Sequence, residues 1–337
     1  MRVARLAGRG RLELGDEPDP VPAPGESLVR VTAVGLCGSD LHWYSEGGIG
    51  DAVLERPLVL GHEVSGVVVS GPHAGRHVAV DPALPCGSCD TCLLGHRNLC
   101  PSVRFAGHGT VDGGLRELMA WPDAQLHLLP DGLTGADATV LEPLGVALHA
   151  MDLAHVRLGA QVTVVGCGPI GLLLVQLARA AGAARVLAVE PLPHRREAAL
   201  RCGADAALDA ADCTSQGVYA SGLGPPGADV VLEVVGSEPA VELAVRAARP
   251  GGRVVLVGIP DEDRTAFPAS VARRKGLTLA VVRRMKEVYP RAVDLVERGV
   301  VDVAPLVTDR FGLEQVEDAF VAAAGRGGLK VVVEVGT

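Results

Sequence analysis

Four of the eight cysteines in this sequence lie close together, in the pattern Cys86-x2-Cys89-x2-Cys92-x7-Cys100. Four thiolates so spaced can surround a zinc ion as a closed tetrahedron, which leaves no coordination position for a reacting molecule. We therefore predict a structural zinc ion that orders this loop, which is rich in proline and glycine. Unused reduced thiols, or a redox pair of Cys86 and Cys89, explain the four regular spacings less well.

A second group of potential metal ligands comes earlier in the chain. Cys37 begins the sequence Cys-Gly-Ser-Asp-x-His42, and His62 and Glu63 follow in Gly-His-Glu. A catalytic zinc ion needs about three protein ligands and one open position for water or a substrate oxygen. Cys37, His62 and a carboxylate would supply that set, with either Glu63 or Glu142 as the carboxylate. Taken alone, a buried small cysteine and a structural histidine are the more common roles of such residues.

A glycine-rich turn follows an apolar run in the middle of the chain. It has the pattern G-x-G-x-x-G and comprises Gly166, Cys167, Gly168, Pro169, Ile170 and Gly171. The glycines allow the backbone to approach a pyrophosphate closely, and the following helix N-terminus presents free N–H groups to it. Glu190 ends the next apolar run, roughly 20 residues on, where a carboxylate holds the ribose hydroxyls of a dinucleotide. The alternatives are an ordinary glycine turn and a surface glutamate.

The elements that must position these residues fall into two kinds. Residues 26–121 contain short apolar runs separated by Gly, Pro and Asp, which predict a mostly β lobe. From about residue 135, strands alternate with helices and predict a doubly wound parallel sheet, so that the chain as a whole is α/β. The six expected strands are 161–166, 185–190, 206–208, 229–234, 253–257 and 278–282. A helix at 313–324 and a strand at 329–335 follow the six strands and are not needed for this sheet, and we expect them to return to the first lobe.

Composition limits the class of protein further. The 337 residues are 48% hydrophobic and carry a net charge of -9, which excludes a disordered chain and argues against a nucleic-acid groove. The longest apolar run, at residues 169–178, is shorter than the ~20 residues of a membrane-spanning helix, and no secretory signal begins the chain. We therefore expect a cytoplasmic protein with no membrane or nucleic-acid partner, in which clustered thiols bind metal.

Taken together and in this order, the motifs resemble those of the zinc-dependent medium-chain dehydrogenases, and the resemblance covers almost the whole chain. Within that superfamily the sequence resembles the polyol branch of sorbitol, xylitol and L-idonate dehydrogenases. Three sequences support this branch, namely Leu41-His42-Trp43-Tyr44, Pro57-Leu-Val-Leu-Gly-His-Glu63 and Glu142-Pro143-Leu144. The sequence Arg104-Phe105-x-Gly107 is similar to that of L-idonate 5-dehydrogenases.

The resemblance implies a two-domain architecture. A GroES-like catalytic domain would comprise residues 1–147 and 285–337, and an NAD-binding Rossmann domain residues 148–284. It also implies two zinc ions per chain, one structural and one catalytic, and a homo-oligomer, either tetramer or dimer.

The resemblance also implies roles for individual residues. Cys37, His62 and Glu63 would bind the catalytic zinc ion, and Glu142 would lie beside the metal or exchange with Glu63. Ser39 would relay the alcohol proton, His42 would pass it to solvent, and Asp40 would orient His62. The implied cofactor contacts beyond the glycine turn and Glu190 are Arg195, Val257, Gly258, Ile259, Val281, Val282 and Arg283. An arginine facing solvent is the alternative role for Arg195 and Arg283.

The activity implied is oxidation of a secondary hydroxyl of a polyol or sugar acid, by hydride transfer to NAD. Polyol enzymes often have tyrosine directly after the relay histidine, whereas this chain has Trp43 followed by Tyr44. A sugar acid would need an arginine, for which Arg104, Arg283 and Arg284 are candidates. Oxidation of L-threonine, an aminocyclitol or a simple secondary alcohol is the alternative. A non-catalytic NAD-binding sensor has no chemical need for the complete set of proposed catalytic residues.

Overall fold

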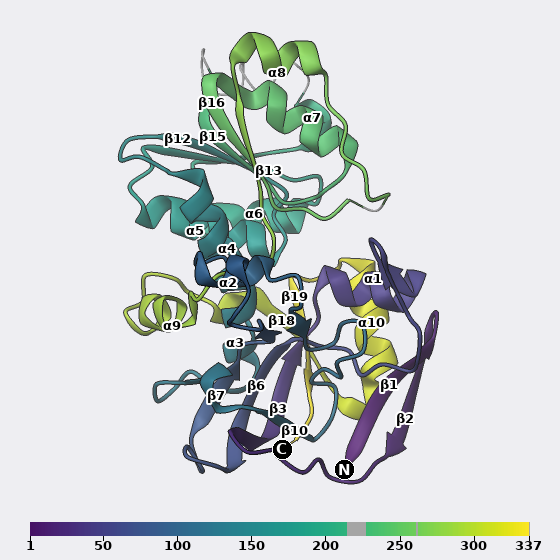
Figure 1. Cartoon of the computed structure of the whole chain (residues 1–337). Coiled ribbons are helices and arrows are strands. Elements are labelled where there is room, and N and C mark those ends of the chain that lie inside the picture. The colour runs from purple at the N-terminus through teal and green to yellow at the C-terminus, as the bar shows by residue number, and fades with distance from the viewer. Residues whose placement is uncertain (214–226, 261, 337) are drawn as a thin grey trace. The chain divides into compact units, whose positions relative to one another are not determined.

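The computed structural model describes residues 1–213, 227–260 and 262–336 (Figure 1). These residues form two compact units, Met1–Pro143 with Tyr289–Thr337, and Leu144–Val288. The boundaries lie a few residues from the expected 147 and 285, because α4 (Leu141–Ala154) runs through the first boundary. Near the second boundary, Met285 and Val288 pack against Gly145 of α4 and so belong to the second unit.

The first unit is built on a mixed sheet with the strand order β11-β7-β6-β3-β19-β18, to which β10 adds by pairing with β3. All neighbours are antiparallel except β18 and β19. The strands are β3 (Glu26–Gly35), β6 (Glu63–Ser70), β7 (His77–Val80), β10 (Leu118–Pro122), β11 (Leu126–Leu128), β18 (Val307–Gly312) and β19 (Lys330–Glu334). The closing strand therefore returns to the first lobe as predicted, whereas β18 has no strong sequence signal and was not predicted.

Further strands and helices complete this unit. They are β1 (Arg2–Gly8), β2 (Arg11–Asp16), α1 (Gly38–Glu46), β4 (Gly48–Ile49), β5 (Ala52–Val53), β8 (Ala83–Leu84), α2 (Asp90–Leu93), β9 (Arg104–Phe105), α3 (Gly135–Thr139), α9 (Tyr289–Glu297) and α10 (Val316–Gly325). The largest fully buried side chains of its core include Trp43, Leu58, Leu60, Met119 and Phe320. Alternate residues of β3, such as Val29 and Val31, are buried beneath these elements, which explains the period-two pattern of that strand.

The second unit contains a parallel sheet with the order β14-β13-β12-β15-β16-β17. Its strands are β12 (Gln161–Val165), β13 (Arg185–Val189), β14 (Ala206–Leu208), β15 (Ala228–Glu233), β16 (Ala248–Leu256) and β17 (Thr278–Val281). The connecting helices are α5 (Pro169–Ala180), α6 (Pro193–Arg201), α7 (Glu238–Ala247) and α8 (Ala269–Lys275). The doubly wound six-stranded sheet is thus confirmed. The strand order reverses on either side of β12, where such folds bind ligands beyond the carboxyl ends of the strands.

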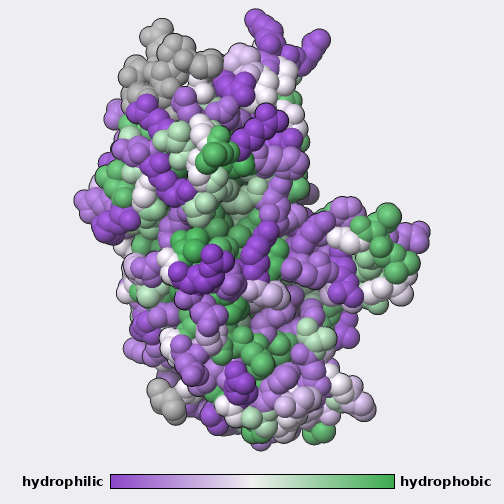
Figure 2. All heavy atoms as spheres, turned by 90° about the vertical axis from the view of Figure 1, so that its left-hand side faces the viewer, coloured by the Kyte–Doolittle hydropathy of each residue, from purple (hydrophilic) through white to green (hydrophobic). Residues whose placement is uncertain are grey.

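Among the residues that the structure describes, no helix is long and apolar enough to cross a bilayer. Figure 2 shows one face of the molecule, on which hydrophobic side chains are interspersed with hydrophilic ones.

Candidate active site

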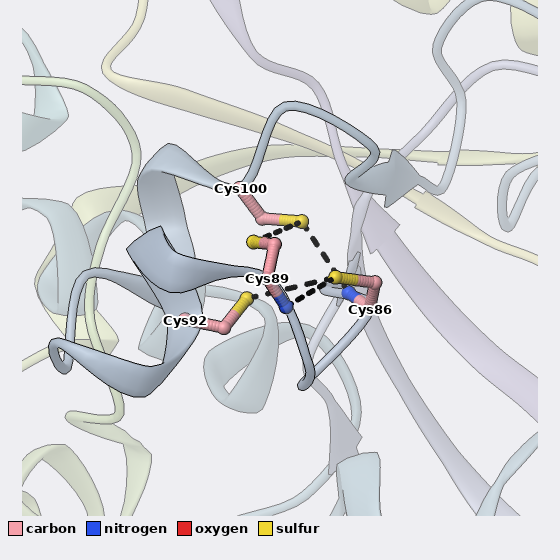
Figure 3. A group of neighbouring side chains, drawn as sticks. All are labelled: Cys86, Cys89, Cys92 and Cys100. Carbon is pink, nitrogen blue, oxygen red and sulfur yellow. Dashed lines mark hydrogen bonds between the residues drawn. The ribbon is translucent and has the colours of Figure 1, made fainter.

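The four cysteines of the loop are gathered around one point. The four Sγ atoms lie within 4.8 Å of one another, and Figure 3 shows them directed toward a common centre. Cys86 Sγ is 4.0 Å from Cys92 Sγ, and Cys89 Sγ is 3.9 Å from Cys100 Sγ. A tetrahedron with Zn–S bonds of about 2.3 Å has sulfur atoms about 3.8 Å apart, so the cluster fits a zinc ion without rearrangement.

Backbone N–H groups favour the thiolate form in this loop. The N–H of Cys89 donates to Cys86 Sγ at 3.4 Å, and the N–H of Cys86 donates to Cys100 Sγ at 3.4 Å. The N–H groups of Ser88 and Cys89 lower the pKa of Cys86 to about 6. Because the thiolate is the form that binds metal, the loop backbone favours zinc binding at Cys86, whereas burial raises the pKa of the Cys92 thiol to about 12.

The second ligand group is brought together by the pairing of two strands. Gly35, the last residue of β3, pairs with Glu63, the first residue of β6. Cys37 follows β3 at the N-terminus of α1, and His62 precedes β6, so the register places the two ligand-bearing segments side by side. The ligand atoms of Cys37, His62 and Glu63 lie within 4.8 Å of one another. A sulfur, an imidazole nitrogen and a carboxylate oxygen form a donor set suited to catalytic zinc.

Asp40 fixes the geometry of this group. Its buried carboxylate accepts hydrogen bonds from the N–H of Cys37 at 2.9 Å and of Gly61 at 3.1 Å. Its Oδ1 lies 3.5 Å from His62 Nδ1. Burial alone would raise the pKa of Asp40, but the charge of His62 and the N–H donors lower it below its usual value. This arrangement is the one that an orienting partner of a metal-bound imidazole requires.

Glu63 has a cationic partner that the sequence analysis missed. Lys330, the first residue of β19, places Nζ 2.7 Å from each carboxylate oxygen of Glu63. The same Nζ donates to the carbonyl oxygen of Leu36 at 3.1 Å. Lys330 is 3% exposed and Glu63 is completely buried. A lysine at the head of the apolar sequence Lys-Val-Val-Val-Glu was the available signal, because an isolated charge in such a strand needs a partner.

Glu142 lies in the first turn of α4 and is buried. Burial, reinforced by the negative charge of Glu63, raises its pKa to about 7 against the opposing effect of His62. Among the described residues, the compact ligand group contains Cys37, His62 and Glu63 but not Glu142. The geometry therefore favours Glu63 as the ligand and leaves Glu142 as a neighbouring acid.

The expected proton relay lies on α1. Ser39 and His42 are three residues apart in this helix and so share one face of it. His42 Nδ1 lies 2.9 Å from Glu46 Oε1, a partner that the sequence analysis did not identify. Trp43, which replaces the tyrosine of many polyol enzymes, is buried with its ring edge-on to His108, and Tyr44 packs on Phe320. Trp43 is thus a core residue.

The glycine turn of the second unit has the conformation that its pattern predicts. Gly166 has a φ of +95°, and a Cβ atom on Gly171 would collide with the carbonyl oxygen of Gly166. The Glu190 carboxylate accepts hydrogen bonds from the N–H of Cys167 at 2.8 Å and of Leu192 at 3.1 Å. It therefore joins the turn to the end of β13, next to the position expected for the adenosine ribose.

The remaining cofactor candidates follow the carboxyl ends of neighbouring strands. Nη1 of Arg195, which lies on α6, is 3.7 Å from the place that a Cβ of Gly168 would occupy. The segment 257–259 follows β16, and a side chain on Gly258 would collide with Gly236. Val281 ends β17, and the N–H of Val282 donates to the carbonyl oxygen of Leu256 at 2.9 Å, ahead of Arg283. All these positions lie at the edge of the sheet where dinucleotides bind in this fold.

Comparison with known proteins is consistent with this geometry. Residues 23–131 match the alcohol dehydrogenase GroES-like domain, and residues 169–298 match the zinc-binding dehydrogenase family. Sorbitol dehydrogenase of Bos taurus is 36% identical over 335 residues, which cover 97% of this chain and 94% of the relative. The chain belongs to the zinc-binding dehydrogenases. Within this family it falls in the polyol branch of the medium-chain enzymes.

Two further comparisons agree. Sorbitol dehydrogenase of Bacillus subtilis is 32% identical over 325 residues, 95% of this chain and 92% of the relative. The structure of L-idonate 5-dehydrogenase from Escherichia coli superimposes with a TM-score of 0.89 at 28% identity, covering 99% of this chain and 97% of that one. The predicted GroES-like and Rossmann folds, and the class of zinc- and NAD-dependent dehydrogenase, are therefore confirmed.

Proposed function

We propose that this dehydrogenase oxidises a secondary hydroxyl of a polyol or sugar acid of the sorbitol, xylitol or L-idonate class, with NAD as the acceptor. The observation that carries the proposal is the buried Cys37, His62 and Glu63 donor set, held by Asp40 and Lys330. It occurs in a chain that is 36% identical to a sorbitol dehydrogenase. When bound, zinc lowers the pKa of a hydroxyl group and the nicotinamide ring accepts a hydride.

The residues of the first unit would bind the metal and transfer the proton. Cys37, His62 and Glu63 would hold zinc, and the buried acid Glu142 would act near them. Ser39 accepts the proton of the hydroxyl group, and His42 carries it to solvent with its Nδ1 held by Glu46. The cysteine loop would hold a second zinc ion with a structural role.

The second unit binds NAD in this proposal. The turn at Gly166, Gly168, Pro169, Ile170 and Gly171 would hold the pyrophosphate, and Glu190 would accept hydrogen bonds from the ribose hydroxyls. Arg195 would contact the adenosine. The segments Val257, Gly258 and Ile259, and Val281, Val282 and Arg283, would line the nicotinamide. Their common location at the carboxyl ends of the strands supports these assignments.

The sugar acid L-idonate is the substrate that we would test first among charged ones. The His62 and Phe105 rings lie 5.4 Å apart at their centroids, so β9 borders the zinc ligands, and exposed Arg104 is the neighbouring residue on that strand. Successive side chains of a strand point to opposite faces, so Arg104 would bind a substrate carboxylate only if its long side chain turned toward the ligand side, and Arg104→Gln tests this.

A substrate panel followed by NADH absorbance tests the proposal. Sorbitol, xylitol and L-idonate should be oxidised with the highest kcat/KM, and L-threonine, an aminocyclitol and a simple secondary alcohol should be poor substrates. Arg104→Gln should lower kcat/KM for L-idonate only. Preferred oxidation of L-threonine or the aminocyclitol would overturn the substrate assignment.

We also propose a homo-oligomer, a dimer or tetramer, in the cytoplasm. Strand β17 ends the order of the parallel sheet, and its Val281 is 74% exposed. An unpaired strand edge of this kind can pair with the same strand of a second copy. All eight cysteines are free thiols, which suits a reducing compartment. Sedimentation equilibrium tests the oligomer, and a monomer at micromolar concentration would refute it.

A further inference from the structure

Lys330 is a buried lysine at the start of a strand whose next three residues are valine. It is the one lysine among the buried polar side chains of the described residues, and it opens β19. An ammonium group loses its hydration when it is buried, and a hydrophobic side chain of similar volume often serves stability equally well. Its charge therefore needs an explanation beyond the packing of the sheet.

The contacts of Lys330 connect both segments that carry ligands. Its Nζ is 2.7 Å from both oxygens of Glu63, which directly follows His62, and 3.1 Å from the carbonyl oxygen of Leu36, which directly precedes Cys37. The backbone secures the lysine opposite this point, because the N–H of Leu36 donates to the carbonyl oxygen of Val331 at 2.9 Å. One ammonium group thus bridges the end of β3 and the start of β6.

The space around the ion pair leaves Glu63 little alternative. A Cβ atom on Gly35 would collide with Oε2 of Glu63, so the missing side chain at this position makes room for the carboxylate. The carboxylate has two oxygens with about four lone-pair sites, and the ion pair leaves some of them available for a metal. Glu63 can therefore keep Lys330 as a partner while it binds zinc.

We propose that Lys330 is a positioning residue, an internal cation that holds Glu63 and the segment before Cys37 in the ligand arrangement before zinc binds. Without it, the zinc-free site would bury the carboxylate of Glu63 without the cation that is hydrogen-bonded to it, which is strongly unfavourable. With zinc bound, the metal itself compensates that charge. The inference rests on the proposed catalytic zinc site.

The test compares the melting temperatures of zinc-free and zinc-loaded protein. Lys330→Met should lower the Tm of the protein freed of catalytic zinc by about 10 °C, and that of the zinc-loaded protein by less than half as much. Metal analysis fixes the content of the two forms, one and two zinc ions per chain. Lys330→Arg keeps the charge and should recover most of the zinc-free Tm. Equal losses in the two forms, or no loss in the zinc-free form, would overturn the proposal.

Lys275 provides a matched control. Its Nζ donates hydrogen bonds to the carbonyl oxygens of Val245, Arg246 and Ala248. These residues lie in the second unit, which contains none of the proposed zinc ligands. Lys275→Met should therefore lower the Tm of both forms equally. A larger loss of Tm in the zinc-free form of this control would mean that zinc removal sensitises the whole protein, and the proposal would fail.

A double substitution covers the case in which Lys330→Met does not fold without zinc. Glu63→Gln removes the buried charge, so the double variant Glu63→Gln with Lys330→Met should fold without zinc and melt above the single lysine variant. A double variant no more stable than Lys330→Met would contradict the proposal. These readouts are melting temperature and metal content, so they remain valid for a chain that fails the substrate panel, and the two proposals fail separately.

Discussion

The two predicted zinc sites are assembled in different ways. In the cysteine loop, all four ligands come from one short stretch, and the backbone N–H groups of that same stretch stabilise the thiolates. In the catalytic group, Cys37 and Glu63 meet because two strands pair, and the partner of Glu63 is Lys330, which is 267 residues away in sequence. The cysteine site can be recognised from the spacing of its ligands in the sequence, whereas the group of Cys37, His62 and Glu63 forms only when the sheet is complete.

The largest expected effect separates the two sites by activity. Cys37→Ser removes a ligand of the proposed catalytic zinc, and kcat should fall by more than about a hundredfold, because the loss of an outer partner of a ligand alone costs about 10–100-fold. NADH binding, followed by fluorescence titration, should be unchanged because the second unit is intact. Full activity of this variant would show that the group is not catalytic.

The next effect separates them by stability. Cys89→Ser opens the closed shell of the loop, so the zinc content should fall by one ion per chain and the Tm by about 5–10 °C. At a temperature where the variant is folded, kcat should stay within a few-fold of the parent. Loss of kcat without loss of Tm would reverse the roles that we give to the two sites.

A smaller effect concerns the choice of cofactor. Glu190 would repel a 2′-phosphate, so NAD should be preferred over NADP by at least roughly tenfold in kcat/KM, or about 1.4 kcal/mol. Glu190→Ser should shrink or reverse this preference, since Arg195 lies beside the glycine turn and could then bind the phosphate. Arg195→Ala is the control and should leave the preference for NAD. Equal use of both cofactors by the unmodified enzyme would refute the argument.

The smallest effect is a pH dependence within the first unit. Burial lowers the pKa of His127 from 6.5 to about 4, and its ring stacks on Tyr289 at 4.5 Å. The folded-state pKa lies below the unfolded one, so the unfolded chain takes up a proton between these pH values that the folded chain does not. Stability should therefore be full above pH 6.5 and fall toward pH 4. When the pH is lowered from 6.5 to 4, the Tm of His127→Phe should fall by about 2–4 °C less than the Tm of the unmodified protein. Identical slopes would exclude His127 as a cause.

Much of this molecule could be predicted because its signals are local. The spacing of the cysteines, the glycine turn and the run that ends at Glu190 each lie within a short stretch, and the structure brings each together as the pattern indicates. Strands β12, β13, β15 and β16 were identified because buried parallel strands are continuous apolar runs. Strands β14 and β17 are partly exposed at the edges of the sheet and were identified as short apolar runs between helical segments.

What could not be predicted depends on distant pairing. The role of Lys330 requires the register of β19 against β3, and β18 is recognisable only once β19 is in place beside it. The hairpin of β1 and β2 was missed because its second strand is largely exposed and alternates polar with apolar residues poorly. Glu46 lies four residues after His42, a spacing that is common on exposed helix faces. The sequence therefore did not single it out as the partner of the proposed relay histidine.

The position of β19 also affects how the chain matures on the ribosome. The second unit is complete once residue 288 has emerged, so it can fold during synthesis, as domains commonly do. The sheet of the first unit lacks its strand between β3 and β18 until residues 330–334 have left the exit tunnel. The unit that is synthesised first is thus finished last. Loading of the proposed catalytic zinc would then follow the addition of β19 to the sheet, and a nascent chain truncated before residue 330 should carry a folded nucleotide-binding unit without the Lys330 partner of Glu63.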